Sequence, residues 1–259
     1  MGDALTHLGV NFFLECKSLR YISLPPSLKK LEEQTFGNCS NLESVTFNDK
    51  LEIIGEGCFA NCVKLKSIIV SKNLRIIEDG AFHGCYDLEK VTLNSKLLSI
   101  GKSSFQNCHS LKTLNLPDSV TKIGSVALCE CKKLEECRLP PNLRSLGAGC
   151  FQKCESLKSI VIPDMMEVVD AVCFSSCSEL ESVVLGKSVM ALGEGGEPRG
   201  ANRRGLCCTL VTRCASPEER SDNAFCTLVI RCARNSNNNH RRSLFSLASL
   251  VYLFACSLD

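Results

Sequence analysis

Apolar residues recur through most of the chain with a fixed period of 23 residues. Eight cysteines mark this period. Leucine follows each of them by three positions, and phenylalanine, with one exception, precedes each by three. They are Cys16, Cys39, Cys62, Cys85, Cys108, Cys131, Cys154 and Cys177. A fixed period between about 20 and 50 residues is typical of a solenoid, in which stacked units share a core that no single unit can form.

The spacing inside one unit predicts three short elements. Apolar residues six and eight positions after the cysteine, such as Ile68 and Val70, follow the period of two of a half-buried strand. A second extended segment follows, as at 120–123, and Gly124 then supplies a turn. Residues 81–85 place two apolar side chains three positions apart, which suits a helical or 3-10 turn. We therefore expect an α/β-type repeat solenoid with short second strands and 23 residues per rung.

One unit reads Leu-Asn-Leu-Pro at 114–117 and Ser-Val-Thr-Lys-Ile-Gly at 119–124, beside Phe-x-x-Cys-x-x-Leu at 105–111. This pattern resembles the BspA-like leucine-rich repeats over residues 5–193. The resemblance implies a right-handed, curved solenoid with a parallel sheet, and an activity of binding instead of catalysis. Members of that family are mostly surface or secreted proteins, which implies the same location for this chain.

Two segments are expected. Residues 5–193 hold eight full units and a stub, and residues 194–259 lose the phase at once. Up to residue 195 there are 17 Lys and 4 Arg, whereas from 196 onward there are no Lys and 9 Arg. We interpret 194–259 as a poorly structured tail of out-of-frame or read-through sequence. No export signal is expected at the N-terminus, because residues 1–8 have neither a basic end nor an apolar stretch.

Composition and charge argue against several functions. Thirty basic and 28 acidic residues give a net charge of +2, which removes the electrostatic argument for a nucleic-acid partner. Only four His are present. We find no Ser/His/Asp set, no paired catalytic carboxylates, no P-loop and no GxGxxG, because the polar residues of the array are periodic instead of convergent. The sequence therefore predicts no enzyme, no cofactor and no small-molecule substrate.

Three interpretations of the cysteine ladder are open. Free cysteine is among the most buried residue types, so each thiol can fill the same gap in every rung. Disulfides between adjacent rungs are also within geometric reach, and metal binding would need clustered ligands. Packing is favoured, because a ladder repeats for packing and metals do not take one ligand per rung. Cys58, Cys150, Cys173 and Cys137 are interpreted in the same way.

A charged residue stands four positions after each ladder cysteine, and its sign alternates from unit to unit. The residues are Arg20, Glu43, Lys66, Glu89, Lys112, Glu135, Lys158 and Glu181. Strands of one sheet lie about 4.8 Å apart, so each charge would lie between two opposite ones. We expect this charge ladder to favour correct rung register. A recognition stripe is the alternative.

The outward position between the two buried strand residues is the candidate ligand-binding surface. These side chains are mostly uncharged, which suits a protein contact summed over several rungs. They are Ser23, Thr46, Ile69, Thr92, Asn115, Arg138, Val161 and Val184. The sequence thus predicts a protein-protein interaction or adhesion module whose partner is another protein, such as a host or matrix surface protein. A scaffold with no dedicated ligand is the rival, since Thr, Ile and Val also favour strands.

Two further possibilities concern the tail. Cys207, Cys208, Cys214, Cys226 and Cys232 could bind zinc, but their spacings lie outside the usual C-x₂₋₄-C. Residues 244–258 form an apolar run behind Arg241 and Arg242 that would span about 22 Å as a helix. That is short of the roughly 30 Å hydrocarbon core of a bilayer, so membrane attachment through this run is a weak alternative.

Overall fold

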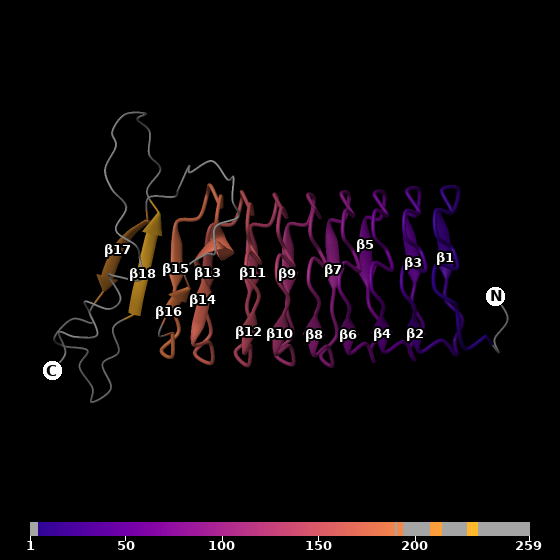
Figure 1. Cartoon of the computed structure of the whole chain (residues 1–259), viewed down its shortest axis with the longest axis horizontal. Coiled ribbons are helices and arrows are strands. Elements are labelled where there is room, and N and C mark those ends of the chain that lie inside the picture. The colour runs from indigo at the N-terminus through magenta and orange to yellow at the C-terminus, as the bar shows by residue number, and fades with distance from the viewer. Residues whose placement is uncertain (1–4, 190, 194–207, 214–226, 233–259) are drawn as a thin grey trace.

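The chain forms an elongated stack of rungs that follow one another in chain order along the molecule (Figure 1). The structure is a computed structural model and describes residues 5–189, 191–193, 208–213 and 227–232. Each rung contributes two short strands, which the chain reaches in turn, so equivalent residues of successive rungs lie side by side. The predicted 23-residue solenoid with parallel strands is confirmed.

The first strands of successive rungs start 23 residues apart, and most of them pair in parallel with a neighbour. They are β1 (Tyr21–Ser23), β3 (Ser44–Thr46), β5 (Ser67–Ile69), β7 (Lys90–Thr92), β9 (Thr113–Asn115), β11 (Glu136–Arg138), β13 (Ser159–Val161) and β15 (Ser182–Val184). Their middle residues face the core, and in most of them both flanking residues are exposed. This is the alternation that the sequence predicted.

The second strands form a more continuous sheet, in which β2 to β12 are hydrogen-bonded in order. They are β2 (Lys30–Leu31), β4 (Ile53–Ile54), β6 (Ile76–Ile77), β8 (Ser99–Ile100), β10 (Lys122–Ile123), β12 (Ser145–Leu146), β14 (Val168–Asp170) and β16 (Ala191–Gly193). Glycine follows many of these strands because the backbones of neighbouring rungs approach each other too closely there for a Cβ atom. A Cβ on Gly147 would lie 2.1 Å from the backbone nitrogen of Ser125, which no side chain tolerates.

The expected helical turn is instead a pair of tight turns. In the rung at 80–85, His83 N–H donates to the Gly80 carbonyl (2.9 Å) and Cys85 N–H to the Phe82 carbonyl (3.3 Å). Gly80 and Gly84 have φ of 60° and 70°, so left-handed residues four positions apart interrupt any helix. Within the described residues the only helix is the 3-10 turn Ala171–Phe174. The α/β class is therefore not confirmed, and the array is a β-solenoid.

Aromatic rings stack through the core along the axis of the array. Phe36, Phe59, Phe82 and Phe105 are fully buried, and neighbouring rings in this file lie 5.2–5.4 Å apart and nearly parallel. Leu128 interrupts the file before Phe151. A ring in every rung at one place on the core face explains why phenylalanine recurs with the period of the rung.

The cysteine ladder is a file of buried thiols that donate hydrogen bonds. Cys85 Sγ lies 3.2 Å from the carbonyl oxygen of Phe59 in the preceding rung, and the same contact recurs from Cys39 to Cys177 at 3.0–3.4 Å. Burial raises the pKa of Cys85 to about 12 and that of Cys39 to about 11. Every cysteine from Cys16 to Cys177 is a free thiol, and all but Cys16 are buried, so packing is confirmed over disulfides for these residues.

Two strands are described within the segment 194–259, β17 (Cys208–Arg213) and β18 (Thr227–Cys232). They pair with each other in antiparallel fashion, and β18 also pairs antiparallel with β15 (Figure 1). The outer edge of β15, the first strand of the last rung, is therefore paired with another strand. The interpretation of 194–259 as sequence without an evolved fold remains a prediction, as do the handedness and curvature of the stack.

Candidate binding surfaces

The predicted strand-face residues lie on one side of the array. Thr46, Thr92, Asn115 and Arg138 are exposed third residues of their strands. Ile69 and Val161 are 70% and 60% exposed, the highest values among the large apolar residues that the structure describes. Ser23 is also exposed, whereas Val184 is half-buried. Register places these side chains in one file, with Ile69 beside Thr92 and Val161 beside Val184.

A second exposed file on the same face was missed by the sequence reasoning. It comprises the first residue of each first strand, which the strand period also turns outward. The residues are Tyr21, Ser44, Ser67, Lys90, Thr113, Glu136, Ser159 and Ser182. Their position five residues after each ladder cysteine could have revealed them, because a strand that buries one residue exposes both neighbours. Side chains from two files therefore make this face.

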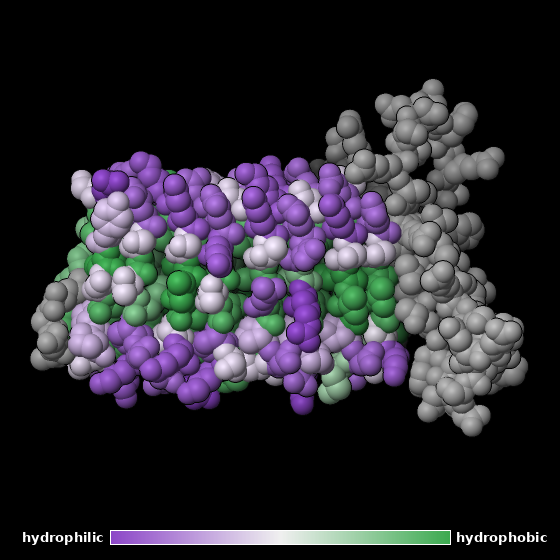
Figure 2. Space-filling view, turned by 180° about the vertical axis from the view of Figure 1, so that it is seen from behind, coloured by the Kyte–Doolittle hydropathy of each residue, from purple (hydrophilic) through white to green (hydrophobic). Residues whose placement is uncertain are grey.

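Hydrophobic and hydrophilic side chains are separated across the width of this face. Figure 2 shows a hydrophobic band, interrupted by polar side chains, that runs the length of the array between two hydrophilic margins. Exposed apolar residues of the first strands include Tyr21, Ile69 and Val161. This distribution offers a partner a long surface of mixed character.

The charge ladder forms fewer ion pairs than its alternation predicted. All eight ladder residues are described, and among neighbours in the ladder only Arg20 and Glu43 form an ion pair, with Nη2 to Oε1 at 2.7 Å. Tyr21 donates its hydroxyl to the other oxygen of Glu43 at 2.8 Å. The hydrogen bonds from Tyr21 and Arg20 lower the pKa of the Glu43 carboxyl. Over the other rungs the ladder carries charge without close pairing.

Backbone pairing, by contrast, follows the charge ladder. The N–H of Glu43, Glu89, Glu135 and Glu181 donates to the carbonyl of the basic ladder residue one rung earlier, at 2.8–2.9 Å. Accordingly β1–β3, β5–β7, β9–β11 and β13–β15 are fully paired. β7 and β9 share one residue pair, and neither β3 and β5 nor β11 and β13 are hydrogen-bonded neighbours among the described strands. Along the first-strand face, full backbone pairing thus alternates with weak or absent pairing.

A hollow of about 660 Å³ lies between β11 and β13, where the two strands are not hydrogen-bonded to each other. The predicted residues Asn115, Arg138 and Val161 line it together with Glu136 and Asp164. Its floor is apolar, with buried Leu139, Ile160 and Ile162 and the prolines Pro141 and Pro163. The structure thus brings three predicted residues together in a concave site.

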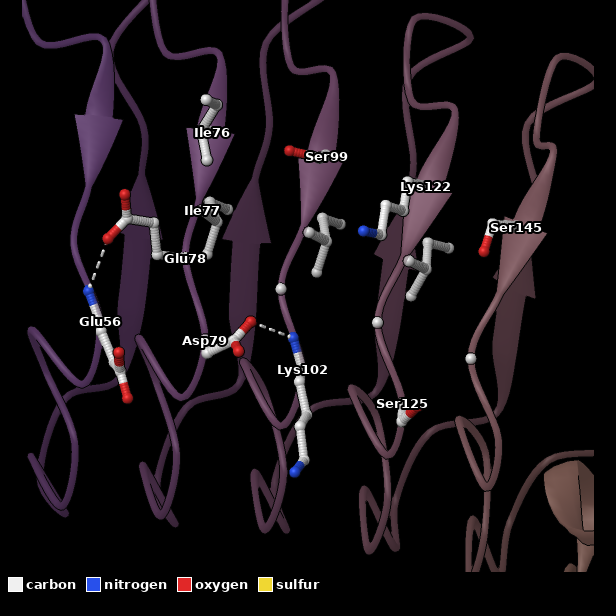
Figure 3. Close-up of a pocket in the computed structure, with 15 residues that line it drawn as sticks. Glu56, Ile76, Ile77, Glu78, Asp79, Ser99, Lys102, Lys122, Ser125 and Ser145 are labelled. Atoms are coloured by element: carbon white, nitrogen blue, oxygen red, sulfur yellow. Dashed lines mark hydrogen bonds between the residues drawn. The ribbon is translucent and has the colours of Figure 1, made fainter.

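A second hollow of about 550 Å³ lies on the second-strand face and was not anticipated (Figure 3). Ile76, Ser99, Lys122 and Ser145 of the second strands line it, beside Glu78 and Asp79. The Glu78 carboxylate accepts the backbone N–H of Glu56 at 3.1 Å, and Asp79 accepts that of Lys102 at 2.7 Å (Figure 3). These carboxylates cap backbone groups of neighbouring rungs, so they have an evident structural role.

Comparison with known proteins identifies the repeats. Six copies of the family model described as "BspA type leucine rich repeat region" match residues 1–112 and 75–195. The chain belongs to this family. The repeats make up most of the described part of the chain. The family resemblance that was inferred from the Phe-x-x-Cys-x-x-Leu pattern is confirmed. Proteins of leucine-rich repeat families are generally interaction or adhesion modules.

Solved structures of bacterial leucine-rich repeat proteins are similar to this chain. A T. pallidum leucine-rich repeat protein is 30% identical, with a TM-score of 0.58 over 62% of this chain and 78% of the other. A leucine-rich repeat protein of Bacteroides ovatus is 24% identical, with a TM-score of 0.38 over 72% of this chain and 66% of the other. No curated protein matches the chain.

The alternatives drawn from the tail concern residues beyond most of the described structure. The run 244–258 and the side chains of Cys207, Cys208, Cys214, Cys226 and Cys232 lie outside what the structure describes. Among the described residues, no helix is long and apolar enough to cross a bilayer. Nor does any group of three or more His, Cys, Asp or Glu in that part of the chain have the arrangement of a metal site.

Proposed function

We propose that this BspA-type chain is a non-catalytic protein-interaction or adhesion module whose partner docks on the face of the first strands. The observation that carries the proposal is the exposure of Ile69 and Val161 on a sheet whose other face is fully packed. Burying exposed apolar surface is the main driving force for protein association. The partner is expected to be another protein that contacts several rungs, such as a host or matrix surface protein.

Side-chain chemistry on this face also supports docking over catalysis. The polar residues of both files repeat along the stack instead of converging on one point, whereas catalysis needs a singular constellation. Hydroxyl and apolar side chains such as Ser67, Ile69 and Thr113 suit a contact whose area comes from many similar rungs.

A matched pair of substitutions tests the proposal. Phage-displayed random peptides are selected on the immobilised full chain, and the enriched peptides are then measured against Val161→Asn and Val168→Asn. Val161 is 60% exposed on β13 and Val168 is 55% exposed on β14, so the two substitutions differ mainly in the face that they alter. To keep the change free of charge, both substitutions are made to asparagine: we expect Val161→Asn to weaken binding at least tenfold and Val168→Asn to leave it unchanged, with similar melting temperatures.

The scaffold alternative predicts a different result. If no peptide is enriched, or if the enriched peptides bind Val161→Asn as tightly as the parent chain, the first-strand face is not a docking surface. The combination Ile69→Asn and Val161→Asn extends the same test over both exposed apolar side chains of the predicted file.

A further inference from the structure

The hollow between β11 and β13 differs from the rest of the docking face in shape and in charge. It lies where two rungs are not joined by first-strand hydrogen bonds, and it opens on the predicted file between Asn115, Arg138 and Val161. Its apolar floor of about five side chains suits an aliphatic group, and its rim is charged. A site of this kind selects one type of partner side chain.

The charges on the rim are not balanced. Arg138 is the one basic residue of the lining, and its Nη2 lies 3.6 Å from Asp118 Oδ1, so a neighbouring carboxylate already offsets its charge. Glu136 is exposed and forms no ion pair among the described residues. Asp164 accepts the N–H of Lys187 through Oδ1 at 2.9 Å, which leaves its other oxygen for a partner. Two carboxylates thus border an apolar floor.

We infer that the hollow between β11 and β13 receives a lysine or arginine side chain of the protein partner. Its aliphatic stem lies on Val161 and Pro163, and its cationic head reaches Asp164, while Glu136 at the start of β11 adds negative charge to the rim. Long basic side chains combine an apolar stem with a charged head, which matches this arrangement of floor and rim. Charge-assisted hydrogen bonds to carboxylates are stronger than neutral ones, so the contact fixes the position of the partner along the array. This inference rests on the proposed docking face.

Peptide selection on the full chain provides the test. Peptides enriched by the parent chain are expected to share a lysine or arginine next to apolar residues. One such peptide is measured by fluorescence anisotropy against the double variant Glu136→Gln, Asp164→Asn, in which both side chains keep their shape and the amide oxygen introduced by Asp164→Asn can still accept the Lys187 N–H. We expect at least tenfold weaker binding, and a similar loss when the basic residue of the peptide is replaced by norleucine.

Glu89→Gln is the matched control, because Glu89 is an exposed carboxylate of the charge ladder that does not line the hollow. It should leave the affinity unchanged. Enriched peptides without a basic residue, or an unchanged affinity in the double variant, would overturn the inference. If those peptides still lose binding to Val161→Asn, the docking face stands and only its cationic specificity is wrong. Peptides that are indifferent to Val161→Asn contradict the proposed function as well.

Discussion

Individual residues in the turns carry backbone strain that the stack maintains. All rungs but the last have two positions of positive φ, and eight of these fifteen residues are glycine or asparagine, which adopt the left-handed region most readily. Val126 occupies one of them with φ of 50°, although its branched Cβ makes this conformation costly. The fold therefore holds Val126 in a conformation that its own side chain disfavours.

Replacing this residue should stabilise the chain. Val126→Asn is expected to raise the free energy of unfolding by about 1 kcal/mol, since asparagine tolerates left-handed backbone and Val126 is only half-buried. Chemical denaturation measures the difference. Val168→Asn, at an exposed position of an extended strand, should bring no gain, and equal effects of both variants would show that φ is not the cause.

The imidazole of His109 is expected to make stability depend on pH. Its ring stacks on Tyr86 at 4.9 Å, and Nε2 is buried without a hydrogen bond among the described residues, with Glu130 Oε2 at 3.9 Å from it partly opposing the effect of burial. Burial and then the charge of Lys132 lower the pKa of His109. The unfolded chain, with a histidine pKa of about 6.5, therefore binds a proton more readily than the folded chain. Stability should fall as the pH drops from about 7.5 through the lowered pKa.

His109→Gln should reduce this loss. Melting temperatures of the parent and the variant are compared at about pH 7.5 and pH 5.5, with His83→Gln as the control for removing an imidazole. The parent and His83→Gln should lose more stability on acidification than His109→Gln. Equal slopes in all three chains would show that His109 does not contribute.

At the scale of the element, the thiol file explains why the repeated residue is cysteine. The sequence analysis interprets the repeated cysteine as a small apolar residue, and the burial of its side chain agrees with this interpretation. The hydrogen bond from each Sγ to a carbonyl of the preceding rung gives the position a polar requirement as well. That carbonyl already accepts a backbone N–H within its own rung, as the Phe59 carbonyl does from Cys62 at 3.2 Å, so the thiol supplies a second donor to it.

Substitutions at Cys85 separate these two requirements. Cys85→Ser retains a donor and should cost about 1 kcal/mol, whereas Cys85→Val adds volume, loses the donor and should cost about 2 kcal/mol or more. Thermal denaturation ranks the variants. Exposed Cys16→Ser is the control and should stay within about 0.5 kcal/mol of the parent. A valine variant more stable than the serine variant would mean that packing alone selects cysteine.

The elements differ in how far the sequence predicts them. Both strands of each rung follow from apolar spacing, because burial repeats with the stack. The turn at 80–85 does not, since a spacing of three suits a helix and a tight turn equally. The hollow beside Arg138 depends on which neighbouring strands pair through their backbones, and no side-chain pattern encodes that directly. Exposure of the predicted file was therefore predictable, and its concave site was not.

For the whole molecule, the ends of the array matter most. The outer edge of β15 is paired with β18, and an unpaired strand edge is a template for association. A chain ending at Gly193 should therefore self-associate more than the full chain, as sedimentation velocity would show. A chain ending at Cys232 keeps both strands and should behave like the full chain. If the chain ending at Gly193 stays monomeric, β18 does not protect this edge.

The pairing of rungs also restricts how such a chain can change in length. Deleting or duplicating 23 residues would place two rungs with a glutamate in the charge ladder, or two with a basic residue, next to each other. It would also shift the alternation of strongly and weakly paired first strands in every later rung. A change of 46 residues would keep both the alternation of charges and the alternation of strongly and weakly paired first strands. Recombination within the gene should therefore yield stable proteins more readily when copies are gained or lost two at a time.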